Sequence, residues 1–369
     1  LPGLIRQYGS SVILVTGRRS FIDSADFSKL LESFRKEGIK HHLVSVDGEP
    51  SPELIDETVN RFRDEYPASV VSIGGGSAID AGKAISAMIQ MPDSVKEYLE
   101  VVGNKEHPGT KIPFIAIPTT SGTGSEATKN AVISSVGING FERSLRHENF
   151  VPDIALIDPE LTLNCPPDIT GASGMDCFTQ LVEAYLSVKA CEFTDALAES
   201  GLKAIKRSLL RSYTSGEDKA ARTDMSFAAL TSGVCLANAG LGTVHGLAGT
   251  IGGHYNIPHG LVCGTLMAVT NGVNVRELRR TISGSEALSR YAALGRLFID
   301  RVGMSDDYYT DGFISFLYEL TDTLKLPGLK KFGLDEKEIR IICSDADNKN
   351  NPVRLSADDL TEIVTRRLV

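Results

Sequence analysis

The chain has 369 residues and a hydrophobic fraction of 42%, which is enough for two domains with a large core. Its net charge of −9 and pI near 5.4 argue against nucleic-acid or anionic-membrane partners, because both need a positive field. Six scattered cysteines without a CxxC pair are typical of reduced thiols in a cytosol. With no long apolar run and no signal peptide in the sequence, we expect a cytoplasmic protein.

The first part of the chain alternates predicted strands and helices. Strand-like runs lie at 11–16, 42–46, 69–73, 113–117 and 154–158, and helical spacing follows the first three of them. Short strands separated by helices of this length predict right-handed βαβ crossovers and a mostly parallel sheet covered on both faces. Ligands of such sheets bind at the carboxyl ends of the strands.

After about Pro159 the strand-like runs largely disappear. Helical periodicity marks segments 176–187, 194–212, 225–239, 287–302, 312–324 and 356–368. The last begins with Ser356 and Asp359 in capping-box positions. We therefore expect a dinucleotide-binding α/β domain over residues 1–160 and a helical metal and substrate domain over 161–369, with the active site in the cleft between them.

A glycine turn follows the third predicted strand. Gly74, Gly75 and Gly76 lack a Cβ, so the backbone can bend tightly and approach a bulky group, and Ser77 can cap the next helix. Backbone N–H groups at such a helix start suit a nucleotide phosphate. The alternative is a tight turn whose glycines serve packing alone.

A second polar loop, PTTSGTGSE, follows the fourth predicted strand. Its hydroxyls at Thr119, Thr120 and Thr123 can hold phosphates or a nicotinamide amide, and Thr123 with Glu126 fits a capping box that starts a helix. Alone, the loop is equally well a Ser/Thr-rich connection. Two such loops after two strands of one sheet favour a dinucleotide site.

The residues after the first strand bear on which coenzyme is used. Enzymes that prefer NAD often place an acid where the ribose 2′-hydroxyl lies, whereas a small residue near arginine accommodates a 2′-phosphate. Gly17, Arg18 and Arg19 therefore lean toward NADP. The alternative is that both arginines are solvated turn residues.

The helical half contains candidate metal ligands. Asp176 and Gln180 stand at i and i+4 on one helix face. His245 and His259 would be about 21 Å apart on one straight helix, but the Gly252-Gly253 pair and Pro258 supply a break that can bring them together. One carboxylate with two histidines suits Fe²⁺ or Zn²⁺. Alternatively, Asp176 caps a helix with Ser173, and His259 lines a turn.

The motifs GGGSAIDAGKA, PTTSGTGSEAT, GMDCFTQLVEAY and HGLAGTIGGHYNIPHG, in this order, resemble the iron-containing (group III) alcohol dehydrogenases, which share a fold with dehydroquinate synthase. The resemblance implies a Rossmann-like domain, a helical domain, and hydride transfer between NAD(P) and an alcohol or aldehyde. It further implies contacts to the coenzyme and ligands to the metal. The implied coenzyme contacts are Gly75, Gly76, Ser77, Asp80, Thr119, Thr120 and Thr123, and the implied ligands are Asp176, His245 and His259.

Two positions depart from the family pattern. The fourth ligand is usually histidine and here is Gln180, a weaker and neutral ligand. A second histidine, four residues after the first of the late pair, is linked in the family to substrate or proton handling. Here that position is Gly249, so the relay needs a substitute such as His254, a ribose hydroxyl or water.

The hypothesis is therefore an NAD(P)-dependent alcohol dehydrogenase or aldehyde reductase whose divalent ion polarises the substrate oxygen. Asp176, His245 and His259 would hold this ion, with Gln180 as a candidate fourth ligand. A metal-free reductase, a dehydroquinate synthase-like lyase and a nucleotide-sensing protein on an inactive dehydrogenase fold are the alternatives. The resemblance also favours a homodimer or larger assembly. Nothing in the sequence identifies the substrate.

Overall fold

The computed structural model describes residues 1–137, 140–281 and 285–369. The chain forms two compact units. The first unit contains Leu1–Thr120, Gly124–Ser135 and Glu142–Thr162, and the second contains Ser121–Thr123, Val136–Phe141 and Leu163–Val369.

The first unit is built on a five-stranded sheet with the order β2-β1-β3-β4-β7, in which every neighbouring pair is parallel. The strands are β1 (Ser11–Gly17), β2 (Lys40–Val46), β3 (Ser69–Gly74), β4 (Phe114–Pro118) and β7 (Ile154–Ala155). The predicted parallel sheet is thus confirmed, although β7 is shorter than expected.

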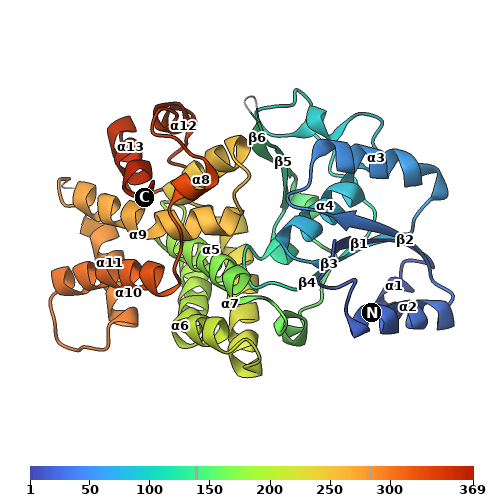
Figure 1. Ribbon diagram of the computed structural model, residues 1–369, viewed down its shortest axis with the longest axis horizontal. Helices are drawn as coiled ribbons and strands as arrows, with labels where there is room; N and C mark the ends of the chain where they lie inside the picture. The colour runs from blue at the N-terminus through green and yellow to red at the C-terminus, as the bar shows by residue number, and fades with distance from the viewer. Residues whose placement is uncertain (138–139, 282–284) are drawn as a thin grey trace. The chain divides into compact units, whose positions relative to one another are not determined.

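Helices cover both faces of this sheet (Figure 1). The helices are α1 (Pro2–Ile5), α2 (Ala25–Lys36), α3 (Pro52–Phe62) and α4 (Gly76–Met88). Ile5 and Phe34 pack with Val71 and Ile73 on one face. Gly82 of α4 lies against Ser72 on the other face, because successive strand residues point to opposite sides.

A two-stranded sheet of β5 (Asn130–Ser135) and β6 (Phe141–Arg146) completes the described strands and was not expected from the sequence. Both segments mix polar and apolar residues, so neither forms a continuous apolar run. β5 instead packs against α4, where Ala131 and Ile133 are fully buried.

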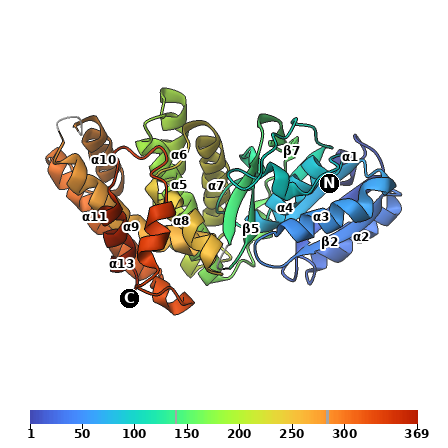
Figure 2. The ribbon, with the colours of Figure 1, turned by 90° about the horizontal axis from the view of Figure 1, so that it is seen from above.

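The second unit is helical, as predicted. Its helices are α5 (Pro167–Leu186), α6 (Glu192–Thr214), α7 (Lys219–Ala239), α8 (Thr243–His254), α9 (His259–Leu278), α10 (Ser285–Phe298), α11 (Asp306–Thr323), α12 (Ile339–Asp345) and α13 (Ala357–Arg366). Figure 2 shows α5, α8 and α9 close together within the unit. The Ser356–Asp359 capping box at the start of α13 is confirmed.

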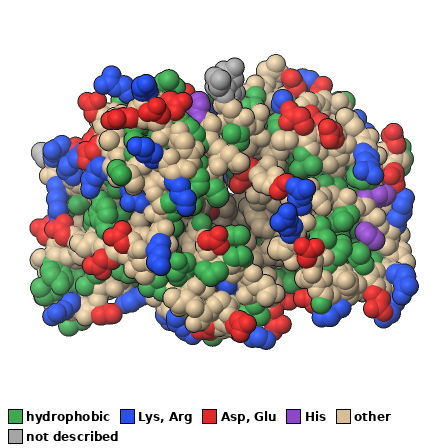
Figure 3. All heavy atoms as spheres, in the orientation of Figure 1, with side chains coloured by type: hydrophobic (Ala, Val, Ile, Leu, Met, Phe, Trp, Pro, Cys, Tyr) green, Lys and Arg blue, Asp and Glu red, His purple; other side chains and the backbone are tan. Residues whose placement is uncertain are grey.

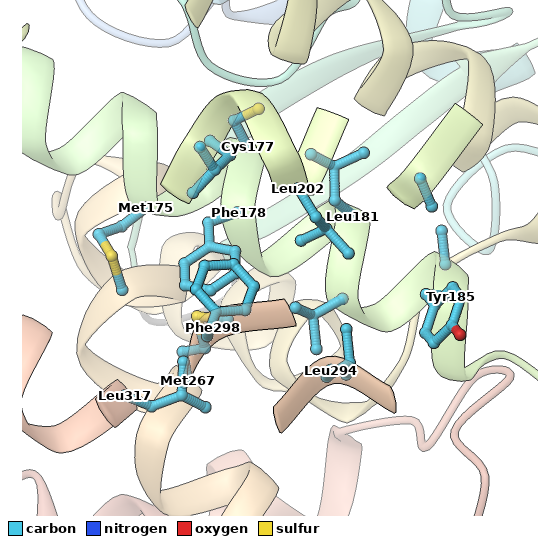
Figure 4. Close-up of a cluster of buried hydrophobic side chains, with 14 of the residues drawn as sticks. Met175, Cys177, Phe178, Leu181, Tyr185, Leu202, Met267, Leu294, Phe298 and Leu317 are labelled. Atoms are coloured by element: carbon cyan, nitrogen blue, oxygen red, sulfur yellow. The ribbon is translucent and has the colours of Figure 1, made fainter. Parts of the chain in front are cut away.

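The core of the helical unit is apolar and rich in aromatic rings (Figure 4). Phe178 of α5 lies 5.1 Å from Phe298 of α10, measured between ring centroids. Met175, Leu181 and Met267 are fully buried around them. Since Met175, Phe178 and Leu181 take one side of α5, its remaining side is free to present Asp176, Gln180 and Glu183 elsewhere.

Among the described residues, no single helix has the length and apolar character to cross a membrane. Helices α7 and α8 pass that test only as a pair, and they bend by 99° where they meet. On the face drawn in Figure 3, basic and acidic side chains are interspersed, with no extended basic patch.

Candidate functional site

Three loops meet at the carboxyl edge of the parallel sheet. Gly74 ends β3 beside Pro118 of β4, and the Thr119 N–H donates to the Gly74 carbonyl at 2.9 Å. A Cβ on Gly74 would lie 3.3 Å from the Gly17 nitrogen, and one on Gly75 would lie 3.4 Å from the Thr120 hydroxyl. The structure therefore brings the predicted coenzyme-binding loops together.

The helix after the glycine turn starts without a side-chain cap. Its N-cap is Gly75, whose φ of −73° is ordinary. Close approach accounts for Gly74, where a Cβ would lie 2.6 Å from Ala78 Cβ, whereas a Cβ on Gly75 would make ordinary contacts. The sequence suggested that Ser77 caps this helix. Its hydroxyl instead donates to Glu49 Oε2 at 2.9 Å. The first N–H groups of α4 thus have no side-chain cap, which suits an anion.

The side chains of Asp80 and Lys83, both on α4, form hydrogen bonds with the segment that follows β4. Asp80 is buried and accepts a hydrogen bond from the Val132 N–H at 3.1 Å, which argues against a direct coenzyme contact. The Lys83 ammonium donates to the carbonyls of Ser125 and Asn130, at 2.8 and 2.7 Å. Burial lowers the pKa of Lys83 to about 8. This lysine ties the segment after β4 to α4.

Glu126 in this segment makes stability depend on pH. Burial raises its pKa to about 7 from an ordinary 4.5, so the folded state holds its proton where the unfolded state releases it. The stability it contributes is full below about pH 4.5 and is lost as pH rises through about 7. Between about pH 5 and 8, the free energy of unfolding of the wild type should fall by up to about 3 kcal/mol more than that of Glu126→Gln. Urea unfolding at a series of pH values measures this difference. An equal loss in both proteins would contradict the assignment.

Four candidate ligands converge within the helical unit. They are Asp176 on α5, His245 on α8, and His259 and Cys263 on α9. One ligand atom from each lies within 4.8 Å of all the others. Asp176, His245 and Cys263 are buried, and His259 is partly so. The structure therefore assembles the three ligands predicted from the sequence and adds a cysteine.

Glu183, one helical turn beyond Gln180, fixes His245. Its carboxylate lies 2.6 Å from His245 Nδ1 and accepts the Val244 N–H at 2.7 Å. Nδ1 then carries a proton, and Nε2 faces Asp176 Oδ1 at 3.2 Å. An unprotonated Nε2 and the carboxylate oxygen would repel each other at this distance, so either a second proton or a cation must lie between them. A carboxylate behind the outer ring nitrogen is the usual support of a metal-binding histidine.

The charges in this cluster favour a cation. Burial alone would raise the pKa of Asp176, but the hydrogen bond from His245 and the nearby imidazoles lower it to about 2. Burial alone would lower the pKa of His245, yet its electrostatic interactions and hydrogen bonds with Cys263, Glu183 and Asp176 hold it well above its usual value. A buried set of this composition is suited to a divalent ion.

Gln180 and Thr123 both contact Asp176. Gln180 Nε2 lies 3.4 Å from Asp176 Oδ2, and the buried amide oxygen has no hydrogen-bond partner among the described residues. The Thr123 hydroxyl donates to the same Oδ2 at 2.8 Å. The expected Thr123–Glu126 capping box is wrong, because Gly124 in a left-handed conformation precedes only a short 3₁₀ turn, Ser125–Ala127.

Comparison with known proteins identifies the family. Residues 1–159 match the family described as iron-containing alcohol dehydrogenase, and residues 170–368 match the C-terminal domain of the Fe-containing alcohol dehydrogenase family. The chain belongs to the iron-containing alcohol dehydrogenase family. The predicted fold, enzyme class and NAD(P)-dependent oxidation or reduction of alcohols and aldehydes are confirmed at this level.

Several relatives of this iron-containing alcohol dehydrogenase are similar over most of their length. The NADPH-dependent butanol dehydrogenase of Clostridium saccharobutylicum is 30% identical over 96% of this chain and 91% of its own. The NAD-dependent methanol dehydrogenase of Bacillus methanolicus is 29% identical over 99% and 94%. Long-chain-alcohol dehydrogenase 1 of Geobacillus thermodenitrificans is 35% identical over 69% of this chain, which spans only 64% of that protein.

A solved structure of 1,3-propanediol oxidoreductase superposes with a TM-score of 0.86 at 26% identity, covering 99% of this chain and 93% of its own.

The helix of His245 in this alcohol dehydrogenase ends later than the sequence predicted. Gly252 and Gly253 lie inside α8, which continues to His254, and the break follows at the extended Tyr255 and ends at Pro258. His254 is nine residues beyond His245, about 900° of helical rotation, so it points to the opposite face. This geometry argues against His254 as the proton relay.

Gly249 stands one turn after His245, where the family commonly has histidine. A Cβ there would meet no atom within 4 Å, whereas a Cβ on Gly246 would lie 1.7 Å from the Asp347 carbonyl oxygen. We expect Gly249→Ala to stabilise the protein by up to about 1 kcal/mol through helix propensity, and Gly246→Ala to destabilise it by about 1–3 kcal/mol. Thermal unfolding of the two variants, side by side, checks this, and equal effects would contradict the packing of α8.

Proposed function

We propose that this enzyme transfers hydride between NAD(P) and a small alcohol or aldehyde, with a divalent ion bound by Asp176, His245 and His259. The observation that carries the proposal is the convergence of these side chains, together with Glu183 behind His245. These side chains come from three helices and meet in a buried cluster, where a bound cation would neutralise the negative charge of the carboxylate.

The residues present fit a divalent ion. When bound, the ion supplies Lewis acidity that polarises the substrate oxygen. Glu183 keeps the proton on His245 Nδ1 and leaves Nε2 as a ligand. The Thr123 hydroxyl orients the Asp176 carboxylate by occupying one side of Oδ2. Gln180, whose amide oxygen is buried beside Asp176, remains a candidate neutral ligand.

The coenzyme is assigned to the loops at the carboxyl edge of the sheet. The uncapped N–H groups of α4 suit its diphosphate, next to Gly75 and Gly76. The hydroxyls of Thr119 and Thr120, which follow β4 directly, suit the polar groups further along it. Lys83 supports this arrangement indirectly, because it ties down the segment that follows the loop.

The end of β1 favours NADP. A Cβ on Gly17 would meet nothing within 4 Å, so this position leaves space for a 2′-phosphate. Arg18 is largely exposed and forms an ion pair with Asp47, from which it can turn toward an anion. The relative named for NADPH dependence supports this preference, while the NAD-dependent relative shows that similar chains use either coenzyme.

Gly17→Asp should move the preference toward NAD. The new carboxylate repels a 2′-phosphate and can accept hydrogen bonds from the ribose hydroxyls, so we expect the NADPH-to-NADH ratio of kcat/KM to fall about tenfold or more. Gly3→Asp adds the same charge at another open glycine of the first unit and should leave the ratio unchanged. An unchanged ratio in Gly17→Asp would refute the placement of the ribose.

The reaction itself is tested by NADPH and NADH oxidation over aldehydes, keto acids and sugar aldehydes, with and without added Fe²⁺ or Zn²⁺. We expect substrate-dependent oxidation that rises with metal. Full activity in metal-depleted protein identifies a metal-free reductase. Binding without steady oxidation identifies a sensor or a lyase that uses NAD transiently. The homo-oligomer and the cytoplasmic location stay predictions from the sequence.

A further inference from the structure

Cys263 occupies the same helical relation to His259 that Gln180 occupies to Asp176. Both pairs are spaced i and i+4, so each second residue lies one turn along the same face. Cys263 is fully buried, and its sulfur lies within 4.8 Å of the candidate ligand atoms of Asp176, His245 and His259. Cys263 on α9 can therefore take the place of the fourth ligand that Gln180 on α5 would supply only weakly.

Two glycines allow α9 to approach α5 this closely. A Cβ on Gly260 would lie 2.7 Å from the Ala172 carbonyl oxygen, and one on Gly264 would lie 2.8 Å from Met175 Cβ. They are one turn apart, directly after His259 and Cys263 respectively. Without them α9 would stand further from α5, because larger side chains separate helix backbones. The packing therefore holds the sulfur beside Asp176.

We propose that Cys263 is the fourth protein ligand of the metal, in place of Gln180, and that its thiolate shifts the preference of the site from Fe²⁺ toward Zn²⁺. This inference rests on the proposed metal-dependent function. On binding, the thiol S–H bond breaks, the sulfur forms a bond to the ion, and the proton passes to solvent.

Ligand chemistry and charge support this assignment. Two histidines and one carboxylate suit either Fe²⁺ or Zn²⁺, whereas an added thiolate favours Zn²⁺, because soft sulfur ligands select it over Fe²⁺. A divalent ion with two neutral imidazoles, the Asp176 carboxylate and the Cys263 thiolate also has no net charge, which reduces the cost of burial. A Gln180 amide would leave one positive charge on the ion and its ligands.

Cobalt substitution tests the proposal with a readout other than activity. The full-length protein is stripped with chelator, reloaded with Co²⁺, and assayed for bound cobalt by dialysis. We expect a sulfur-to-cobalt charge-transfer band in the near ultraviolet in wild type and in Cys343→Ser, whose thiol is buried but belongs to α12. We expect no such band in Cys263→Ser. Bound cobalt without the band in wild type, or a band that survives in Cys263→Ser, overturns the proposal and leaves the proposed function standing.

A measurement on wild type keeps the test decisive if Cys263→Ser does not fold. X-ray absorption of the zinc-loaded protein should show one sulfur at about 2.3 Å from the ion, with nitrogen and oxygen at about 2.0–2.2 Å. A shell of nitrogen and oxygen alone would overturn the cysteine ligand. Failure of wild type to bind cobalt or zinc would overturn both this proposal and the metal-dependent function.

Discussion

Replacing His259 with alanine should remove the metal and lower kcat/KM by about a thousandfold or more. His259 is the first residue of α9 and is the only histidine that this helix contributes to the cluster of described ligands. Polarisation of a substrate oxygen by a metal is worth several kcal/mol, and each 1.4 kcal/mol is about tenfold in rate. The glycine turn at residues 74–77, which we propose binds the diphosphate, lies in the other compact unit, so NADPH binding should be nearly unchanged.

His254→Ala is the matched control for that experiment. It removes an imidazole five residues away in sequence, from the far face of α8, and should retain both metal and activity. The measurements are metal content, NADPH affinity by fluorescence titration, and steady-state kinetics. Unchanged turnover in His259→Ala would refute the metal assignment, and loss of activity in His254→Ala with metal retained would restore the relay role suggested by the sequence.

Glu183→Gln should weaken metal binding by about 10–100-fold without removing it. The glutamate accepts from both His245 Nδ1 and the Val244 N–H, whereas a glutamine of the same size has one oxygen and one NH₂ group. One of the two donors would then face another donor, so the imidazole would lose its orientation and part of its basicity. Chelator competition measures the dissociation constant of the metal.

Glu126→Gln provides the control for this substitution. It makes the same chemical change at a buried glutamate in the first unit and should leave the metal dissociation constant unchanged. Equal affinity in Glu183→Gln and wild type would show that the carboxylate only packs against His245.

The fold was largely predictable because its signals are local. Apolar runs such as 69–73 alternate with amphipathic helices, and this alternation specifies a parallel sheet. The β5–β6 pair was missed because its segments are short and mixed in polarity. Ser77 was expected to cap α4, but the helix starts at Gly76, so the hydroxyl already lies within the first turn and reaches Glu49 instead.

The ligand set was only partly predictable because it depends on helix packing. Motif spacing predicted that His245 and His259 come together, and they do, although the helix of His245 ends after His254 rather than at Gly252-Gly253. Cys263, which we propose as the fourth ligand, was not predicted because that ligand was sought one turn beyond Asp176. The sequence offered two signals, the i+4 spacing of Cys263 from His259 and the glycines at 260 and 264. They could not be interpreted before the structure showed how closely α9 approaches α5.

The metal content of active enzyme decides whether the reaction depends on a bound ion. Protein purified without chelator should contain about one divalent ion per chain, and its NADPH-dependent aldehyde reduction should fall with removal of that ion and return with its replacement. Full turnover by protein shown to be free of metal would rule out a metal-dependent reaction.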